Sequence, residues 1–494
     1  MTVPGALAED ASLPAVLDRL AGWSPGEEDL EAAWLRVADA ACAVRLGSTL
    51  AEWGSARRAL ARDSGATASP GGRGPVAPAS GTAVALAACC RITEVDDIEL
   101  ATCTTPGSVV VPAALATLAL GGAAASGALA DDGVLAAVAT GYEVVLAAAT
   151  LLGGAFAPAA GVWPTRAVAA LGAAATATRV LGLTPEIGRH AAALAAGAAS
   201  AGTSPEPARS WSLGVAVGRG VAAALAAAEG LRGDGALLAR WPAGVYGGSH
   251  PAQVARVAAA LRTGTSAVRR SRLKPYAGAR QVLAGSAMLR ALVETGEVDP
   301  GDVATVLLEV PAAHAGMVDR PLLQVRLDTL ASAQYQLAMA LEAPHHLDEL
   351  EHPLPPPAPV AARMGTVHVA GDDGPTAGGG AGEDFPARWG ARLELVRDGH
   401  GRTRHVATSV PDEDAFGWED VEGKARRLAA ASRGGGASRG GNVSTVDRST
   451  TVGTADGAGL GDVDELLATV RRRDWDRLTA VLVACAVRDD GGVR

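Results

Sequence analysis

The chain has 494 residues and a net charge of −10, from 43 basic and 53 acidic side chains. Apolar residues make up 48% of it and charged residues 19%, which excludes a disordered chain and provides for a large buried core. Because no basic tract offsets the acidic balance, the composition also argues against nucleic acid or an anionic membrane surface as a partner.

Helices are expected to fill the first half of the chain. Residues 28–45 and 48–62 repeat apolar positions at spacings of three and four, as amphipathic helices do. From residue 84 to about residue 261 the segments become Ala-rich, with small residues on every side. This pattern predicts closely packed helices inside a helical domain. The helices expected there are 109–127, 134–152, 164–181, 186–201 and 214–230.

Features of the same half of the chain indicate where in the cell the protein is located. The segment 109–129 is uncharged and long enough to span a bilayer, but its Ala, Gly and Thr content gives little transfer free energy. The next such segment carries Glu143, so we expect both to be buried helices of a soluble protein. The first ten residues lack the basic region of a signal peptide, and the five cysteines show no C-x-x-C spacing. We therefore expect reduced thiols in a cytoplasmic protein.

The pattern changes near residue 271. A helix over 279–295 is followed by a β-like run over 303–310 and a helix near 327–341. Further strands are expected over 366–370, 391–396 and 403–410, and helices over 418–431 and 463–488. Segments 70–81, 371–386 and 433–459 are rich in Gly, Ser, Pro or Thr and are expected to be flexible loops.

These elements predict a mainly α fold with a large all-helical domain and a smaller α+β lid domain. The helical domain begins with residues 1–268, and the lid comprises residues 269–412. Residues 413–494 return to the helical domain.

The first candidate for chemistry is the acidic run Glu94-Val95-Asp96-Asp97, followed by the expected helix start at 104–108. Clustered carboxylates raise one another's pKa and can act as general base or acid. The hydroxyl groups of Thr104 and Thr105, together with free backbone N–H groups at a helix start, suit a carboxylate or a phosphate. The alternative is that the aspartates only cap or salt-bridge a loop.

Two arginines near expected helix starts are the next candidates. Arg166 follows Trp163-Pro164-Thr165 in a first helical turn, where a cation opposes the helix dipole unless it meets an anion. Arg209 lies in a segment placed immediately before the apolar helix 214–230. Each could instead be a surface arginine.

A fourth cluster, at the expected domain junction, contains Lys274, Tyr276, Arg280 and Gln281. Clefts between domains are preferred ligand sites, and these groups could bind a carboxylate or move a proton. The alternative is a structural hinge. Only 2 of the 43 basic residues are lysines, so a retained lysine could be there for its chemistry.

Other site types have little support. The histidines lie outside these clusters, and His314, which follows the strand 303–310, is more typical of a structural residue. No GxSxG, P-loop, HExxH or complete GxGxxG motif is visible, and no metal site is expected.

Taken in order, these segments resemble the 2-methylcitrate dehydratase (MmgE/PrpD) family, which includes cis-aconitate decarboxylase and iminodisuccinate epimerase. The resemblance covers most of residues 30–430 and depends on the order and spacing of the motifs. The matching segments are 94–99, the Thr-Pro-Gly-Ser-Val-Val-Val-Pro run at 105–112, Gly-Tyr-Glu-Val at 141–144, Trp-Pro-Thr at 163–165, Leu-Gly-Leu at 181–183, Lys-Pro-Tyr at 274–276 and Ser-Ala-Gln-Tyr at 332–335.

The resemblance implies a helical domain with an α+β lid, usually in a homodimer. It also implies chemistry without a metal or organic cofactor. Such enzymes remove a proton next to a carboxylate of a di- or tricarboxylate, then eliminate water or carbon dioxide, or reprotonate. The family's Asp96, Asp97, Lys274, Tyr276 and Tyr335 are present.

Other family positions differ. The active-site histidines align with Thr105, Trp163 and Leu283, the catalytic lysine with Arg209, and the first aspartate with Glu94. Threonine, tryptophan and leucine cannot replace histidine as a proton carrier near neutral pH. Arginine, with a pKa of about 12 or above, can hold an anion but cannot serve as a base.

We therefore expect a divergent, cofactor-free lyase or isomerase that acts beside a carboxylate or carbonyl group, including by cyclisation, in specialised metabolism. Asp96 or Glu94 would do the acid–base work, with Lys274 and Tyr276 as proton donors. The expected substrate-binding residues are Asp97, Thr104, Thr105, Trp163, Arg166, Arg209, Arg280, Gln281, Leu283 and Tyr335.

The alternative is a non-catalytic binding or partner subunit that retains the fold. The enzyme hypothesis requires Lys274, Arg209 and Asp96 to share one cavity, within about 15 Å of one another.

Overall fold

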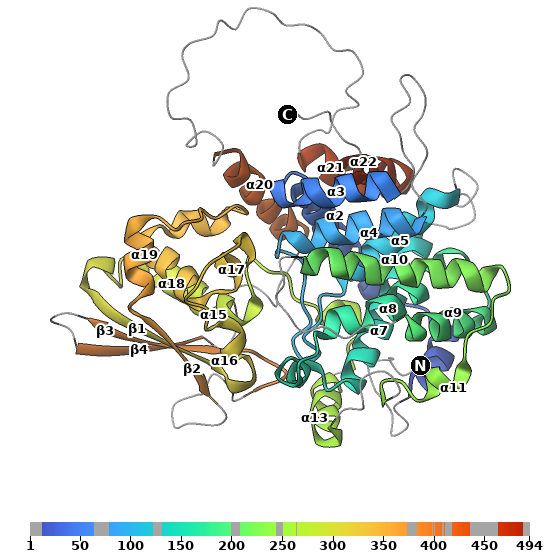
Figure 1. Cartoon of the computed structure of the whole chain (residues 1–494), viewed down its shortest axis with the longest axis horizontal. Helices are drawn as coiled ribbons and strands as arrows, with labels where there is room; N and C mark the ends of the chain where they lie inside the picture. The colour runs from blue at the N-terminus through green and yellow to red at the C-terminus, as the bar shows by residue number, and fades with distance from the viewer. Residues whose placement is uncertain are drawn as a thin grey trace, which may run out of the picture.

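The computed structural model describes most of the chain. The described residues are 12–63, 79–121, 131–198, 208–243, 250–262, 264–372, 382, 384–397, 399, 401–407, 410, 417–434 and 463–487. They form a large helical part and a smaller α+β part, which lie on the right and left of Figure 1. The predicted fold class is confirmed, while the residue boundaries given to its domains stay a prediction.

The helical part is built from the segments whose periodicity predicts helices. Its elements before residue 271 are α1 (Leu13–Ala21), α2 (Glu27–Gly47), α3 (Ala51–Asp63), α4 (Ala79–Ile92), α5 (Gly107–Gly121), α7 (Asp131–Leu151), η1 (Gly154–Ala160), α8 (Pro164–Val180), α9 (Pro185–Gly197), α10 (Arg209–Ala228), α11 (Gly235–Ala239), α13 (Pro251–Leu261) and α14 (Ala267–Arg270).

Small residues allow the central helices to approach closely. A Cβ atom added at Gly220 of α10 would lie 2.3 Å from a backbone carbonyl oxygen of α8. One added at Gly141 of α7 would lie 2.1 Å from the hydroxyl of Thr176 on α8. No larger side chain fits at these crossings, which explains why the sequence is so rich in Ala and Gly here.

The long apolar helices of this part are mostly buried. Asp132–Leu151 and Arg209–Ala228 are long and apolar enough to cross a membrane by length and composition alone. Within the described residues, 89% of the apolar window of the first and 56% of that of the second lie inside the fold. They have the burial expected of core helices.

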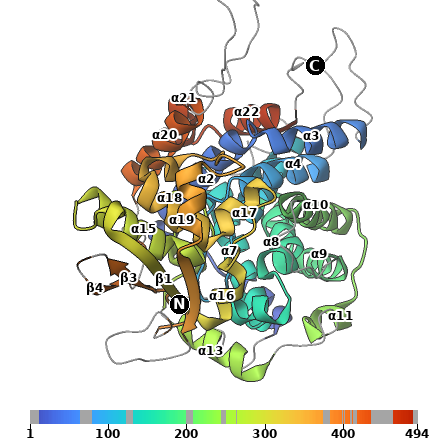
Figure 2. The same cartoon turned by 60° about the vertical axis from the view of Figure 1, so that its left-hand side comes forward.

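The α+β part contains a four-stranded mixed sheet in the order β2-β1-β3-β4. The parallel pair is β1 and β2, and the other two pairs are antiparallel. Helices α15 and α18 contact the sheet, as Figure 2 shows from one side. The elements are α15 (Arg280–Glu294), η2 (Pro300–Asp302), β1 (Val303–Pro311), α16 (Ala312–Val318), α17 (Arg326–Ala331), α18 (Ala333–Glu342), η3 (Pro344–Asp348), α19 (Ala358–Met364), β2 (Val367–Asp372), β3 (Ala391–Arg397) and β4 (Gly401–Ala407).

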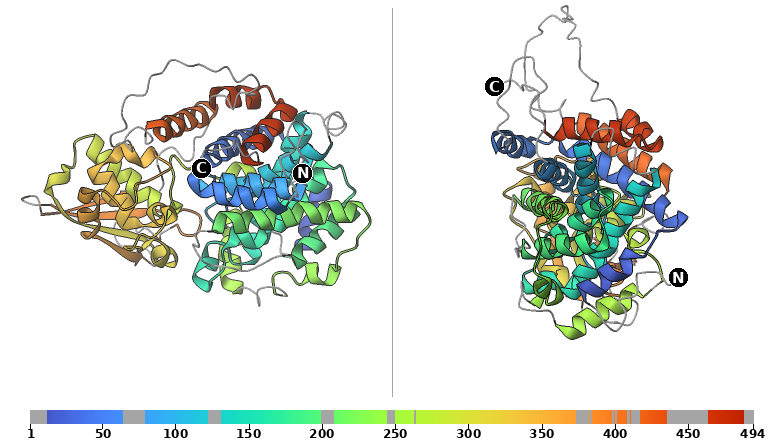
Figure 3. Two further views of the ribbon diagram at one scale, coloured as in Figure 1. Left: turned by 45° about the horizontal axis from the view of Figure 1, so that its top comes forward. Right: turned by 90° about the vertical axis from the view of Figure 1, so that its right-hand side faces the viewer.

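The C-terminal helices α20 (Trp418–Gly434), α21 (Val463–Arg471) and α22 (Trp475–Val487) pack against α2. Figures 1 and 3 show them beside the N-terminal helices, far from their place in the sequence. Val421 and Leu428 of α20 join the main core, and the Trp34 and Trp418 rings stack with centroids 4.5 Å apart. These contacts place the described C-terminal helices against the helical part.

Several predicted element boundaries were wrong. The helix expected over 327–341 is interrupted at Ser332, whose side chain caps α18 by accepting a hydrogen bond from the Tyr335 N–H. The helix expected over 463–488 breaks before α22, where Arg473 has a φ of 54°. The segment around Arg209, expected before a helix, is the first turn of α10.

The expected loops fall partly on regular structure. Residues 79–81 belong to α4, 371–372 to β2 and 433–434 to α20. The structure does not describe residues 70–78 and 435–459 of the first and last of these loops. It also does not describe residues 373–381 and 383 of the loop expected over 371–386. So do the C-terminal ends of the helices expected over 109–127 and 186–201.

Candidate active site

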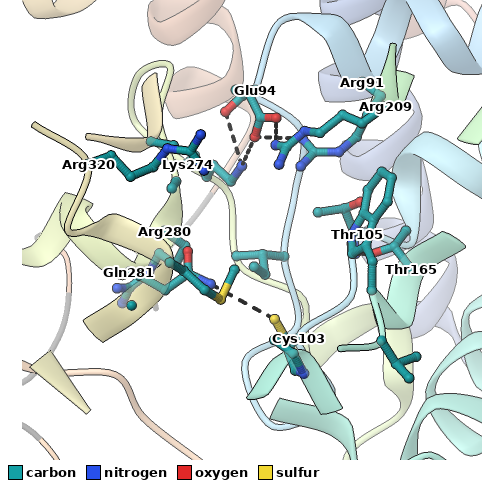
Figure 4. Close-up of a pocket in the computed structure, with 18 residues that line it drawn as sticks. Arg91, Glu94, Cys103, Thr105, Thr165, Arg209, Lys274, Arg280, Gln281 and Arg320 are labelled. Atoms are coloured by element: carbon teal, nitrogen blue, oxygen red, sulfur yellow. Dashed lines mark hydrogen bonds and ion pairs between the residues drawn. The ribbon is translucent and has the colours of Figure 1, made fainter. Parts of the chain in front are cut away.

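A cavity of about 210 Å³ lies where the two parts of the fold meet. The helical part contributes residues from the end of α4, the loop after it and the starts of α8 and α10, and the α+β part contributes the start of α15 and the segment 316–331. Figure 4 shows the lining side chains converging from these elements. Seven residues predicted from the sequence line the cavity: Glu94, Thr105, Trp163, Arg209, Lys274, Arg280 and Gln281.

The lining of this cavity is strongly positive. Among the described residues it includes five cationic side chains and one carboxylate, that of Glu94. Cations that converge on a partly enclosed space attract and orient an anion. The five cations are Arg91, Arg209, Lys274, Arg280 and Arg320.

Glu94 links three of these cations. Its carboxylate lies 2.7 Å from Arg91 Nη1 and 3.6 Å from Lys274 Nζ, and it also contacts the Arg209 guanidinium. Its φ of 58° is unusual for a residue with a side chain. Cys103, also in the lining, has a φ of 54°. Such strained backbone clusters at functional sites.

Asp96 lies beneath the cavity rather than in its lining. Its Oδ1 is 2.7 Å from Arg91 Nη1 and 3.6 Å from Lys274 Nζ, and the residue is 1% exposed. Through the Glu94 carboxylate the same network reaches Arg209. The structure therefore connects Lys274, Arg209 and Asp96 in one network, although only Lys274 and Arg209 line the cavity.

Lys274 is the candidate proton carrier of this network. Its ammonium donates a hydrogen bond of 3.0 Å to the Glu94 carbonyl oxygen. Burial lowers the pKa of Lys274 to about 7; the Asp96 carboxylate opposes this shift, and the Arg91 and Arg209 guanidinium groups and Lys424 reinforce it. A lysine with a pKa near neutrality is present in both protonation states at neutral pH, so it can take up or release a proton.

Trp163 supports the two arginines of the helical part. The guanidinium carbons of Arg91 and Arg209 lie 5.6 Å and 5.5 Å from the centre of its indole ring. Cations over an aromatic face are attracted by the ring quadrupole. The indole thus orients both guanidinium groups and adds an apolar wall to a cationic pocket.

The α+β part contributes the opposite wall. Arg280 donates to the Trp389 carbonyl oxygen at 3.3 Å, and Arg320 donates to the Asp328 carboxylate at 2.8 Å. Gln281 Nε2 lies 4.0 Å from Cys103 Sγ across the cavity. Burial raises the pKa of the Cys103 thiol to about 12, so this cysteine is protonated, and a poor nucleophile, at neutral pH.

The described residues offer no cluster of three or more His, Cys, Asp or Glu side chains that could hold a metal ion. The polar atoms of the cavity are instead mostly donors, which suit an anionic organic molecule.

Comparison with known families agrees with this arrangement. A family model described as the MmgE/PrpD N-terminal domain matches residues 23–252, which include the loop that carries Glu94 and the start of α10. Residues 23–252 are thus identified as an MmgE/PrpD N-terminal domain. Among curated proteins, none matches the chain significantly.

Members of the MmgE/PrpD family are dehydratases and decarboxylases that act on carboxylates. The resemblance noted in the sequence is thus confirmed over residues 23–252. The matched range includes Trp163 and Arg209, whereas Lys274 and the α+β part lie beyond it.

Three predicted residues of the helical part do not line the cavity, and two of them, Asp97 and Thr104, make hydrogen bonds within the helical part instead. Asp97 accepts hydrogen bonds from the Gly107 N–H at 2.8 Å, from the Tyr142 hydroxyl at 2.6 Å and from the Ser271 hydroxyl. The Thr104 hydroxyl lies 2.8 Å from that of Thr102. Arg166, in the first turn of α8, is not among the lining residues.

Three more predicted residues are buried within the α+β part. The Tyr276 hydroxyl is 2.8 Å from the Ser286 hydroxyl, and burial raises the pKa of Tyr276 above its usual 10. Leu283 is fully buried in the core of this part. Tyr335 stacks on His352 with ring centroids 5.3 Å apart. Their side chains therefore pack within the α+β part instead of lining the cavity.

Four polar lining residues were not singled out in the sequence: Arg91, Cys103, Thr165 and Arg320. Arg91 lies three residues before Glu94 at the end of α4, a spacing that places the two side chains together. The spacing of Arg91 and Glu94 in the sequence could therefore have indicated that Arg91 belongs to the site. Arg320 lies in a loop of the α+β part, and nothing in its local sequence indicates the cavity.

Proposed function

We propose that the chain is a lyase or isomerase that removes a proton next to a carboxylate or carbonyl group of a small anionic substrate, using its own side chains. The observation that carries this proposal is the cavity with five cations and one carboxylate, in which Lys274 has a pKa of about 7. Family membership supports the substrate class.

Binding would begin with the arginines. Arg91 and Arg209, held by the Trp163 ring, face Arg280 and Arg320 of the α+β part. Guanidinium groups bind carboxylates through paired hydrogen bonds. An anion seated on these groups would bring its neighbouring carbon to Lys274.

The proton transfer would then use the neutral form of Lys274. Its amine takes the proton from the carbon, and the electron pair of the broken C–H bond moves onto the substrate as an enolate. The surrounding cations stabilise that negative charge. The resulting ammonium returns its proton to a leaving hydroxyl group, to the same carbon after the intermediate has turned over in the cavity, or to a cyclised product, depending on the substrate.

Glu94 and Asp96 would position this machinery. Each carboxylate lies 2.7 Å from Arg91 and 3.6 Å from Lys274, so their negative charge keeps several cations together in one small space. Without these two carboxylates, the crowded cations would repel one another and would move apart or lose protons.

The test is deuterium incorporation from heavy water into a panel of small mono-, di- and tricarboxylic acids, followed by proton NMR. Wild-type protein should exchange a hydrogen next to a carboxylate or carbonyl group in at least one acid, and Lys274→Met should not. Arg219→Leu, at an exposed position of α10, is the matched control and should exchange like wild type. Exchange by Lys274→Met at the wild-type rate would refute the role of Lys274.

A second candidate function is a non-catalytic binding or partner subunit. It is favoured by one observation, that the described lining of the cavity contains no histidine. Under this alternative the wild-type protein binds a carboxylate but exchanges no hydrogen with solvent. Calorimetric binding together with the exchange assay separates the two.

We further propose a cofactor-independent homodimer in the cytoplasm, acting in specialised metabolism. All five cysteines are thiols rather than disulfides in the described structure, which supports a reducing compartment. Sedimentation of the purified chain would measure its oligomeric state.

A further inference from the structure

The two lysines of the chain hold adjacent carbonyl groups of one loop. Lys274 Nζ donates to the carbonyl oxygen of Glu94 at 3.0 Å, and Lys424 Nζ donates to that of Val95 at 2.7 Å. The other 41 of the 43 basic residues are arginines. The chain is rich in arginine, yet both of its lysines bind the loop that presents Glu94 to the cavity.

Lys424 reaches this loop from the far end of the sequence. It lies on α20, is 3% exposed, and pairs with the Asp39 carboxylate of α2 at 2.6 Å. Helix α20 contacts α2 and also η3 of the α+β part. The lysine thus ties the C-terminal segment, a core helix and the cavity loop together, although it does not line the cavity among the described residues.

The loop depends on such side-chain donors for its shape. The Ile92 carbonyl oxygen accepts from the Arg326 guanidinium, and the Glu94 carbonyl oxygen accepts from Lys274 and from the Gly278 N–H. Between these anchors Glu94 has a φ of 58°, which its neighbours must maintain. Without the hydrogen bond from Lys424 to its carbonyl oxygen, Val95 would be free to move between Glu94 and Asp96.

We infer that Lys424 is a positioning residue for the cavity: by holding the Val95 carbonyl from α20, it fixes the loop that presents Glu94 and Asp96 to Lys274. The inference rests on the proposed function for its catalytic meaning, but its geometry can be tested without any substrate. A compact ammonium fits between the Asp39 carboxylate and the Val95 carbonyl, whereas the planar guanidinium of arginine requires more space and a different donor geometry.

Lys424→Arg is the decisive variant because it keeps the positive charge and changes only the geometry. It also leaves Lys274 as the only lysine, so a protein labelled with ¹³Cε-lysine gives one lysine signal whose pH titration reports that side chain. The groups that face Lys274 are Asp96, Glu94, Arg91, Arg209 and Lys424.

If Lys424 positions the loop, the carboxylates of Glu94 and Asp96 retreat from Lys274 in Lys424→Arg. Their attraction favours the ammonium form, so the titration midpoint of Lys274 should fall by about 0.5 or more below its wild-type value. The matched control is Leu428→Ala, which removes a buried contact one turn along α20 without touching the loop. It should lower the melting temperature and leave the Lys274 midpoint unchanged.

Should Lys424→Arg fail to fold, the double variant Asp39→Leu, Lys424→Met removes a neutral buried pair and leaves neither charge unpaired. Because this variant also removes the Lys424 charge, which by itself lowers the pKa of Lys274, its readout is amide hydrogen exchange at Gly278, whose N–H donates to the Glu94 carbonyl oxygen and should exchange faster when the loop is released. A Lys274 midpoint in Lys424→Arg that stays at the wild-type value or rises, or an unchanged exchange rate at Gly278 in the double variant, would overturn the inference. An absence of hydrogen exchange by wild type would refute the proposed function alone, because the midpoint comparison needs no turnover.

Discussion

Replacing Lys274 with methionine should change the stability of the protein in a pH-dependent way, most favourably below neutral pH, while it removes the proposed proton carrier. Lys274 is 2% exposed, and burial lowers its pKa from 10.5 to about 7. A group that binds its proton more weakly in the folded chain than in the unfolded chain makes folding less favourable wherever the unfolded chain holds more protons. Methionine is of similar length and uncharged, so this cost disappears.

The magnitude follows from the two pKa values. Below about pH 7 both states hold the proton, and the wild-type protein bears the full cost of its buried ammonium. Between pH 7 and pH 10.5 the folded chain releases its proton first and the cost fades. Because one pKa unit corresponds to about 1.4 kcal/mol, the advantage of Lys274→Met over wild type should shrink by about 2–3 kcal/mol between pH 6 and pH 9.

Urea unfolding followed by circular dichroism at pH 6, 7, 8 and 9 measures this change. The lost hydrogen bond to Glu94 and the new methyl contacts alter the free energy of unfolding equally at every pH. They therefore do not affect how the difference between Lys274→Met and wild type changes with pH. Leu428→Ala is the control: it should cost about 2–5 kcal/mol at every pH. A difference between Lys274→Met and wild type that stays constant from pH 6 to pH 9 would refute the argument.

Two further pairs of variants test the cavity and the packing around it. Arg209→Leu should weaken binding of succinate, used as a dicarboxylate probe, by about 10–100-fold, since a hydrogen bond to a charged group contributes about 1.5–3 kcal/mol. Arg219→Leu on the same helix should leave the affinity unchanged, and equal affinities of the two variants in calorimetry would contradict the assignment. Gly220→Ala should lower the free energy of unfolding by about 1–3 kcal/mol because its Cβ would lie 2.3 Å from a backbone oxygen of α8. In thermal unfolding, Gly423→Ala, whose Cβ meets nothing closer than 3.6 Å, should instead stabilise α20 by about 0.5–1 kcal/mol.

Much of the fold could be predicted because its signals are local. The spacing of apolar residues predicts α2 and α15 within one or two residues of their observed ends. The four strands were also predicted near their observed positions, yet local sequence contains no information on their order. That β1 lies between β2 and β3 follows from long-range pairing alone.

The cavity was predictable where chemistry clusters in the sequence. Glu94 and Lys274 stood out because an acidic run and a rare lysine are visible locally. Arg320 did not, because only the folded α+β part brings it to the cavity. Conversely, Tyr276 is close to Lys274 in sequence, but the chain directs its side chain into the core of the α+β part, where it meets Ser286. Proximity in sequence does not fix the direction of a side chain.

The most direct measurement is the pH dependence of hydrogen exchange by the wild-type protein with whichever acid it accepts. If neutral Lys274 removes the proton, the rate should rise through a midpoint at about pH 7, level off above it, and be lost in Lys274→Met. A rate without an inflection near pH 7, or one that Lys274→Met retains, would contradict the central claim.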